Sequence, residues 1–247
     1  LKSALALVLT GSLASCNNFL TIEPEDKLVQ DNFFTSTSMV RANTLSLYAS
    51  RTWRDFHMNF QWKLDMLNGD MYYTYSDEGQ WFFGSYTSIN PYVAEGWRGL
   101  YNVIAFANSV INDMPDKCKN VSQSDINAAI AEARCVRGYC YYLIAEVWHD
   151  APIIYNNSEN IDTGNIDVPR NPPKSIYQFA LNDLDFAEKY LPVTDEQSFR
   201  CTKTTARAFR AKLLVTMAAH GDYGYDRANL YKRAAADAKA VIDARPS

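Results

Sequence analysis

The longest periodic stretch of the chain is "SDINAAIAEARCVRGYCYYLIAEVWHD", residues 124–150. Apolar and small residues recur in it at steps of three and four over about six turns, which predicts one long amphipathic helix. Ser122 or Ser124 is a good N-cap, and "HDAPII" (149–154) ends the helix. The predicted inner face consists of Ile126, Ala129, Ile130, Ala133, Val136, Cys140, Ile144 and Val147.

Helical periodicity extends to both sides of this stretch. Residues 39–53 and 95–114 predict two earlier helices. The later helices are predicted from signals at their ends. A capping-box pattern begins one helix and a proline ends it, a threonine begins the next helix, and an aspartate caps the last one. These residues are Ser175 with Gln178, Pro192, Thr204 and Asp226.

The predicted fold class is all-α, because no alternating strand pattern of convincing length occurs. The last helices are rich in alanine, similar in length and joined by short turns. Close packing of such pairs is typical of tetratricopeptide-like stacks, although the exact consensus of that repeat is missing. Residues 37–247 are therefore predicted to form one domain of stacked helix pairs with long loops.

The N-terminal stretch predicts a signal peptide and a lipid anchor. The apolar run within residues 1–15 is too short to span a bilayer but has the length of a signal-peptide core. Leu13-Ala14-Ser15-Cys16 resembles a bacterial lipobox, in which cleavage before the cysteine leaves a lipidated N-terminus. Cys16 is the predicted lipidation site, and residues 16–36 are the predicted tether. The alternative is an ordinary secretion signal with an incidental cysteine.

Composition and motifs exclude several function classes. A formal charge of -4 argues against a nucleic-acid partner. The cysteines and histidines lack metal-ligand spacing, so neither a metal site nor a cofactor is predicted. The chain also lacks the common catalytic and nucleotide-binding motifs. The Asp183/Asp185 pair is interpreted as a solvated helix face. Arg134 and Arg137 with Glu132 are interpreted as a structural ion-pair network on the long helix, so no enzyme is predicted.

The segment at 131–154 resembles the signature helix of SusD/RagB nutrient-binding outer-membrane lipoproteins. Stretches at 97–111, 177–192 and 200–218 resemble further family segments in family order. His149 and Gly138 depart from the family pattern. The matching positions are Ala131, Glu132, Ala133, Arg134, Arg137, Tyr141, Tyr142, Asp150 and Pro152.

The resemblance implies a non-catalytic protein that captures glycans or peptides outside the cell. Family members are lipid-anchored to the outer face of the outer membrane and deliver the ligand to a SusC-like TonB-dependent barrel. They are about twice as long as this chain, so the resemblance implies the N-terminal part of such a protein, with the C-terminal region absent.

The stretch "DMYYTYSDEGQWFFGSYTSINPY", residues 70–92, concentrates aromatic rings among polar residues in a predicted loop. Flat rings stack on the C–H faces of sugars, and polar side chains bond their hydroxyl groups. The family resemblance places part of a glycan-binding arc just before the helix at 97–111. The predicted glycan-binding residues are therefore Trp81, Tyr86, Asn90 and Tyr92. The alternative is that these rings pack the loop onto the helices.

Two other function classes remain open at this point. A tetratricopeptide-type scaffold lipoprotein would bind only protein, and it would not need the aromatic stretch. A lipid-anchored glycoside hydrolase would need a pair of carboxylates flanking a sugar, which the sequence does not suggest.

Overall fold

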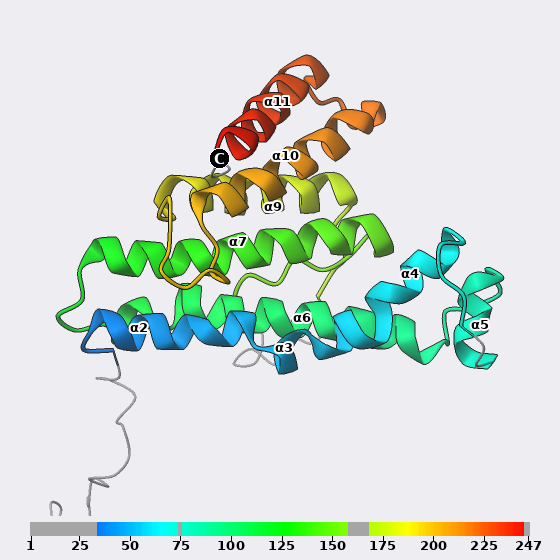
Figure 1. The fold of residues 1–247 in the computed structure, drawn as a ribbon, viewed down its shortest axis with the longest axis horizontal. Helices are drawn as coiled ribbons and strands as arrows, with labels where there is room; N and C mark the ends of the chain where they lie inside the picture. Colours follow the sequence, from blue (N-terminus) through cyan, green and yellow to red (C-terminus); the bar gives the residue numbers. More distant parts are fainter. Residues whose placement is uncertain (1–33, 74–75, 158–167, 245–247) are drawn as a thin grey trace, which may run out of the picture.

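The computed structural model describes residues 34–73, 76–157 and 168–244 (Figure 1). Within these ranges the chain is helical and has no sheet; two isolated bridges join Phe34 to Cys118 and Ala151 to Asn171. The α-helices are α2 (Thr37–Thr44), α3 (Ser50–Phe56), α4 (Trp62–Leu67), α5 (Ser76–Phe82), α6 (Pro91–Asn112), α7 (Gln123–Trp148), α9 (Pro173–Tyr190), α10 (Lys203–Ala219) and α11 (Arg227–Asp243). Short 3-10 turns occupy Leu45–Tyr48, Pro115–Lys117 and Gly221–Tyr223, and a π-helical turn, η4, occupies His57–Gln61.

The all-α prediction is confirmed, and several predicted helix ends are confirmed as well. The Ser122 side chain caps α7 by accepting a hydrogen bond from the Asp125 amide. Asp226 caps α11 in the same way through the Asn229 amide. These caps satisfy backbone donors that the first turn of a helix leaves unpaired.

Other predicted ends were wrong. The helix predicted over 39–53 is interrupted at Ala49, whose backbone is extended (φ -63°, ψ 130°). The helix predicted to begin at 95 begins at Pro91, because Asn90 caps it and proline suits the first position. The Ser175–Gln178 capping box does not form, since α9 already begins at Pro173. Thr202, two residues before the predicted Thr204, caps α10 in a reciprocal box with Thr205.

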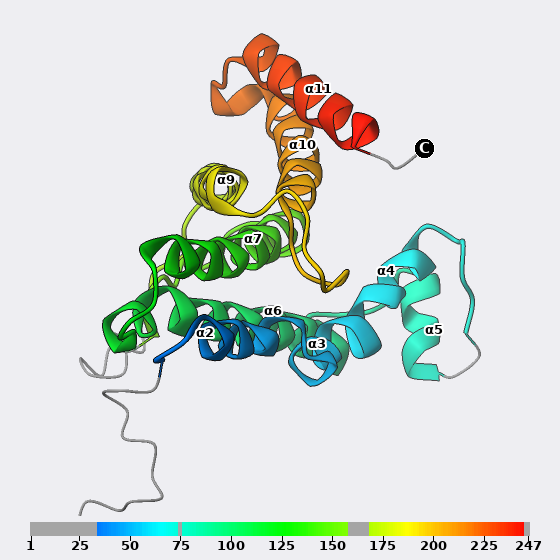
Figure 2. The same cartoon turned by 60° about the vertical axis from the view of Figure 1, so that its left-hand side comes forward.

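Successive long helices stack on one another. In chain order α6 packs on α7, α7 on α9, α9 on α10, and α10 on α11. Figure 2 shows α9 nearly end-on above α7 and beside α10, with α4 and α5 projecting together at one side. The α2–α3 segment lies against the first pair, on α6 and α7. This order confirms the predicted stack of helix pairs.

Two glycines allow α6 to approach the N-terminal helices. A Cβ added at Gly96 would lie 2.4 Å from the Phe60 ring of η4. One added at Gly99 would lie 2.6 Å from the backbone nitrogen of Phe56 in α3. Real side chains do not tolerate such distances, so both positions require glycine at this helix spacing.

Arginine–carboxylate pairs join the layers. Arg137 of α7 donates to both Asp183 oxygens of α9 at 2.7 and 2.9 Å, and to Asn108 Oδ1 of α6 at 2.7 Å. Arg210 of α10 donates to Asp237 of α11 and to Asp185 of α9. The interpretation of Asp183 as a solvated residue was wrong, because its side chain is buried and paired. Arg134 and Arg137 form ion pairs as predicted, but their partner is Asp183 of α9, whereas Glu132 pairs with Arg200.

The predicted signal peptide and Cys16 lie outside the described residues. Among the helices that are described, none combines the length and apolar character of a bilayer-spanning segment.

Candidate functional site

The aromatic stretch at 70–92 is partly helical rather than a loop. α5 covers Ser76–Phe82, a turn follows, and Asn90 begins α6. The stretch packs against α4 and forms the projecting end of the molecule in both ribbon views (Figures 1 and 2). All four predicted glycan-binding residues lie in this one region.

Trp81 is the buried centre of the region. It is 1% exposed, and its ring stacks on Tyr86 with centroids 4.1 Å apart and planes 8° apart. The Phe60 ring meets it edge-on at 5.6 Å. Among the described residues the Trp81 Nε1 has no hydrogen-bond partner. Trp81 therefore presents no free face to a ligand in this structure, whereas Tyr86 is only half-buried.

Asn90 and Tyr92 are held by hydrogen bonds within the same region. Asn90 is 6% exposed; its Oδ1 accepts from the Tyr92 amide at 3.1 Å, and its Nδ2 donates to Gln80 Oε1 at 3.3 Å. The Tyr92 hydroxyl donates to Glu78 Oε1 at 2.8 Å. These contacts fix the start of α6 against α5.

A buried lysine completes the polar part of the region. Lys63 Nζ lies 3.5 Å from the Tyr92 ring centroid and 4.0 Å from that of Trp62, and it donates to the Asn59 carbonyl at 2.6 Å. Burial lowers the pKa of Lys63, while Glu78 and Glu95 oppose that shift. The ammonium group is thus held by two aromatic faces and a backbone carbonyl.

The most exposed rings of the region are ones that the prediction did not single out. Tyr72 is 57% exposed, Tyr73 41% and Phe83 71%; we call these three residues the exposed aromatic edge. Phe82 braces the edge, with its centroid 5.0 Å from Tyr72 and 5.3 Å from Phe83. The sequence prediction favoured other rings of the same stretch, because the exposure of each ring depends on how the stretch packs against α4.

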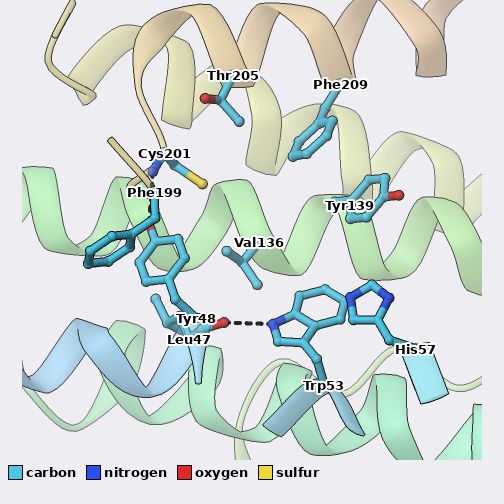
Figure 3. Close-up of a pocket in the computed structure, with 10 residues that line it drawn as sticks. All are labelled: Leu47, Tyr48, Trp53, His57, Val136, Tyr139, Phe199, Cys201, Thr205 and Phe209. Atoms are coloured by element: carbon cyan, nitrogen blue, oxygen red, sulfur yellow. Dashed lines mark hydrogen bonds between the residues drawn. The ribbon is translucent and has the colours of Figure 1, made fainter. Parts of the chain in front are cut away.

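A second aromatic surface was not singled out from the sequence. Side chains from three layers converge on a groove of about 430 Å³, which we call the aromatic groove (Figure 3). Trp53 stacks on His57 at 5.0 Å, and Tyr139 stacks on Phe209 at 4.3 Å. No local motif could have indicated it, because its residues come from distant parts of the chain. They are Leu47, Tyr48, Trp53, His57, Val136, Tyr139, Phe199, Cys201, Thr205 and Phe209.

Comparison with known families and proteins identifies related chains. Residues 18–215 match the SusD-like family model described as "Starch-binding associating with outer membrane". A SusD-like protein of Bacteroides ovatus is 30% identical over 217 residues, which cover 86% of this chain and 39% of the relative. SusD-like protein P2 of Formosa agariphila is 26% identical over 249 residues and is covered to 45%. The chain spans about two fifths of the length of such relatives.

Solved structures share the arrangement of helices. One solved with a xylogluco-oligosaccharide is 26% identical, with a TM-score of 0.71; the match covers 83% of this chain and 40% of that one. A SusD homologue from Bacteroides thetaiotaomicron is 19% identical with a TM-score of 0.66 and supports the fold alone.

Proposed function

This chain belongs to the SusD-like family, and on that premise we propose that it is a non-catalytic glycan-binding protein of the outer membrane. Its role is to capture oligosaccharides for a SusC-like TonB-dependent transporter. The family description, which names starch binding and outer-membrane association, carries the proposal. The relative solved with a xylogluco-oligosaccharide supports a carbohydrate as the ligand class.

We place the sugar contact at the projecting end of the molecule. Tyr72 and Phe83 offer exposed rings on which a sugar can stack. Tyr86 and Tyr92, both half-buried, supply ring edges and hydroxyl groups beside them. Trp81 and Asn90 then do not contact the sugar themselves, but they hold Tyr86 and the start of α6 in place.

The experiment measures glycan affinity and melting temperature on the same variants. Phe83→Ala and Tyr72→Ala should each weaken binding of a xylogluco-oligosaccharide about tenfold, since one stacked ring contributes about 1–1.5 kcal/mol. Their melting temperatures should stay near that of the wild type. Phe106→Ala is the matched control, because Phe106 is 46% exposed on α6 but lies about four turns from Asn90.

Trp81→Ala should instead lower stability, because truncating a buried tryptophan costs about 3–5 kcal/mol. If it does so with affinity unchanged, Trp81 is a packing residue only. Unchanged affinity in both edge variants would reject this placement of the site. Binding of peptides but of no oligosaccharide would reject the glycan proposal, and recovery of a cleaved glycan would reject the non-catalytic one.

The outward-facing anchor at Cys16 is part of the proposal. Acyl chains contribute about 0.8 kcal/mol per buried CH₂ group, so two or more hold a protein stably on a membrane. Labelling with an alkyne fatty acid in a bacterial host should mark the wild type and not Cys16→Ala. A label that persists in the variant would overturn the lipid anchor. If no TonB-dependent barrel copurifies with the protein, the proposed transporter partner is not supported.

A further inference from the structure

Two cysteines from distant segments meet in the core. Cys135 lies on α7, and Cys201 lies just before the Thr202 cap of α10. Both side chains are buried as free thiols, with residue exposures of 0% and 6%. The interaction between the two thiols shifts their pKa values in opposite directions. Arg200, the neighbour of Cys201, pairs with Glu132, three residues before Cys135, at 2.9 Å. The segments that carry the two thiols therefore lie together, although 65 residues separate the cysteines in the sequence.

An ion pair beside the thiols fixes this approach. Arg200, the residue before Cys201, donates to both Glu132 oxygens at 2.9 and 3.1 Å. Glu132 lies three residues before Cys135, so both residues lie on the same face of α7. Arg200 also donates to Thr44 Oγ1 at 2.7 Å. The segment that carries Cys201 is thus clamped onto the turn of α7 that carries Cys135.

The two thiols differ in acidity. Hydrogen bonds from Cys135, and secondarily from the Tyr48 hydroxyl, lower the pKa of Cys201. The same thiol–thiol hydrogen bond, together with burial, raises the pKa of Cys135. Cys201 is therefore the thiol that ionises first and attacks an electrophile, since the thiolate is the reactive form.

Cys201 is also the thiol with a route to solvent. It lines the aromatic groove, and its Sγ points toward α7 in the close-up (Figure 3). Cys135 does not line the groove and is fully buried. A thiol that lines a groove, with a buried thiol on the neighbouring segment, suits the roles of a nucleophilic and a resolving cysteine.

We propose that Cys135 and Cys201 form a reversible disulfide that links α7 to the start of α10. The oxidant is a disulfide, either a small molecule or an exchange protein. The Cys201 thiolate attacks one sulfur of that disulfide, forms a mixed disulfide and expels the other sulfur as a thiolate. Cys135 gives up its proton and attacks the Cys201 sulfur, which releases the second thiolate. The protein loses two electrons and two protons, and one external disulfide becomes two thiols.

The remaining described cysteines do not share this arrangement. Cys140 is buried on α7, and burial raises its pKa. Cys118 is half-buried in the α6–α7 connection, just after the Pro115–Lys117 turn, and burial raises its pKa as well. Neither has a thiol as a hydrogen-bond partner among the described residues, so we expect both to remain reduced when Cys201 reacts.

The test is peptide mapping of the full chain after native oxidation with oxidised glutathione. Free thiols are alkylated in denaturant, and the digest is read by mass spectrometry. The expected result is one linked peptide pair containing Cys135 and Cys201, which disappears on reduction. The oxidised wild type should melt about 5–10 °C higher than the reduced protein, because the bridge closes a long loop.

Variants separate the roles of the two thiols. Cys135→Ser should accumulate glutathione on Cys201, whereas Cys201→Ser should take up much less at either position. Cys140→Ser is the matched control and should keep the linkage. Full alkylation of Cys135 and Cys201 in the oxidised wild type would overturn the proposal, as would a bridge to Cys140 or Cys118. The wild-type map decides the matter even if a variant fails to fold.

Discussion

Arg137 joins three helices through one guanidinium group. It is 4% exposed and bonds Asp183 on α9 and Asn108 on α6. Arg137→Leu should lower the free energy of unfolding by about 3–5 kcal/mol, because it leaves the buried Asp183 carboxylate without its main partner. Chemical denaturation of both proteins measures this difference.

Arg98→Leu is the matched control for that measurement. The Arg98–Asp55 pair is 3.4 Å long, and the Arg98 side chain is 59% exposed. Exposed pairs contribute about 0–1 kcal/mol, so this variant should unfold close to the wild type. Equal losses in the two variants would show that Arg137 acts mainly through the apolar contacts of its stem.

The Arg41–Asp195 pair makes the stability of the fold depend on pH. Arg41 donates to both Asp195 oxygens at 3.0 Å, and these hydrogen bonds hold the pKa of Asp195 below its ordinary value. Because the pKa of Asp195 is lowered in the folded state, the contribution of this ion pair to the free energy of unfolding is fully present above about pH 4 and is lost as the pH falls further.

Asp195→Asn should therefore have a lower melting temperature than the wild type at pH 6, and the difference in melting temperature should become smaller toward pH 3. Melting curves across this range measure it. Asp116→Asn is the control, because Asp116 is exposed and has no ion pair among the described residues. A gap between Asp195→Asn and the wild type that stays constant down to pH 3 would contradict the linkage.

Within α6, the glycine at position 99 sets the distance to α3. Gly99→Ala should cost about 1–3 kcal/mol, because the new methyl group meets the backbone of Phe56, which cannot rotate away. Gly79 is a useful comparison on α5, where an added Cβ finds its nearest neighbour at 3.9 Å. Gly79→Ala should be neutral or stabilising by up to about 1 kcal/mol. Thermal melting of both variants tests the contrast, and similar melting temperatures would refute it.

Helices were predictable where the signal is local. The α7 cap at Ser122 and the α11 cap at Asp226 follow from side chains acting on their own first turn. The break at Ala49 carries no such signal, because alanine favours helices and only the packing of α2 and α3 explains the bend.

The candidate site shows the same limit. The clustering of Trp81, Tyr86, Asn90 and Tyr92 could be expected from their nearness in sequence. The exposure of Phe83 and the burial of Trp81 could not, because both depend on how α5 packs against η4 and α4.

Across the stack of helices, one apolar face remains open between α10 and α11. The groove there has a volume of about 770 Å³, with Val215 and Tyr231 49% and 43% exposed. Exposed apolar patches promote association. We expect the 247-residue chain to self-associate at high concentration, as sedimentation velocity can measure.

Val215→Lys and Tyr231→Lys should shift the chain toward monomer. Val193→Lys is the control, because Val193 is 69% exposed on the connection before α10 but does not line the groove. Sedimentation that is the same for all four proteins would show that the face does not drive association.

The alternation of charge from helix to helix restricts how this architecture can be rearranged. Repeat proteins commonly gain or lose whole units, because neighbouring units present similar surfaces. Here α9 supplies Asp183 toward Arg137 on one side and Asp185 toward Arg210 on the other. Excising α9 would leave the buried Arg137 without Asp183, its bidentate partner, whereas Arg210 would keep Asp237 of α11. The carboxylates of α9 therefore restrict which helices can be neighbours in the stack. A rearranged stack would have to supply matching acidic residues opposite these arginines.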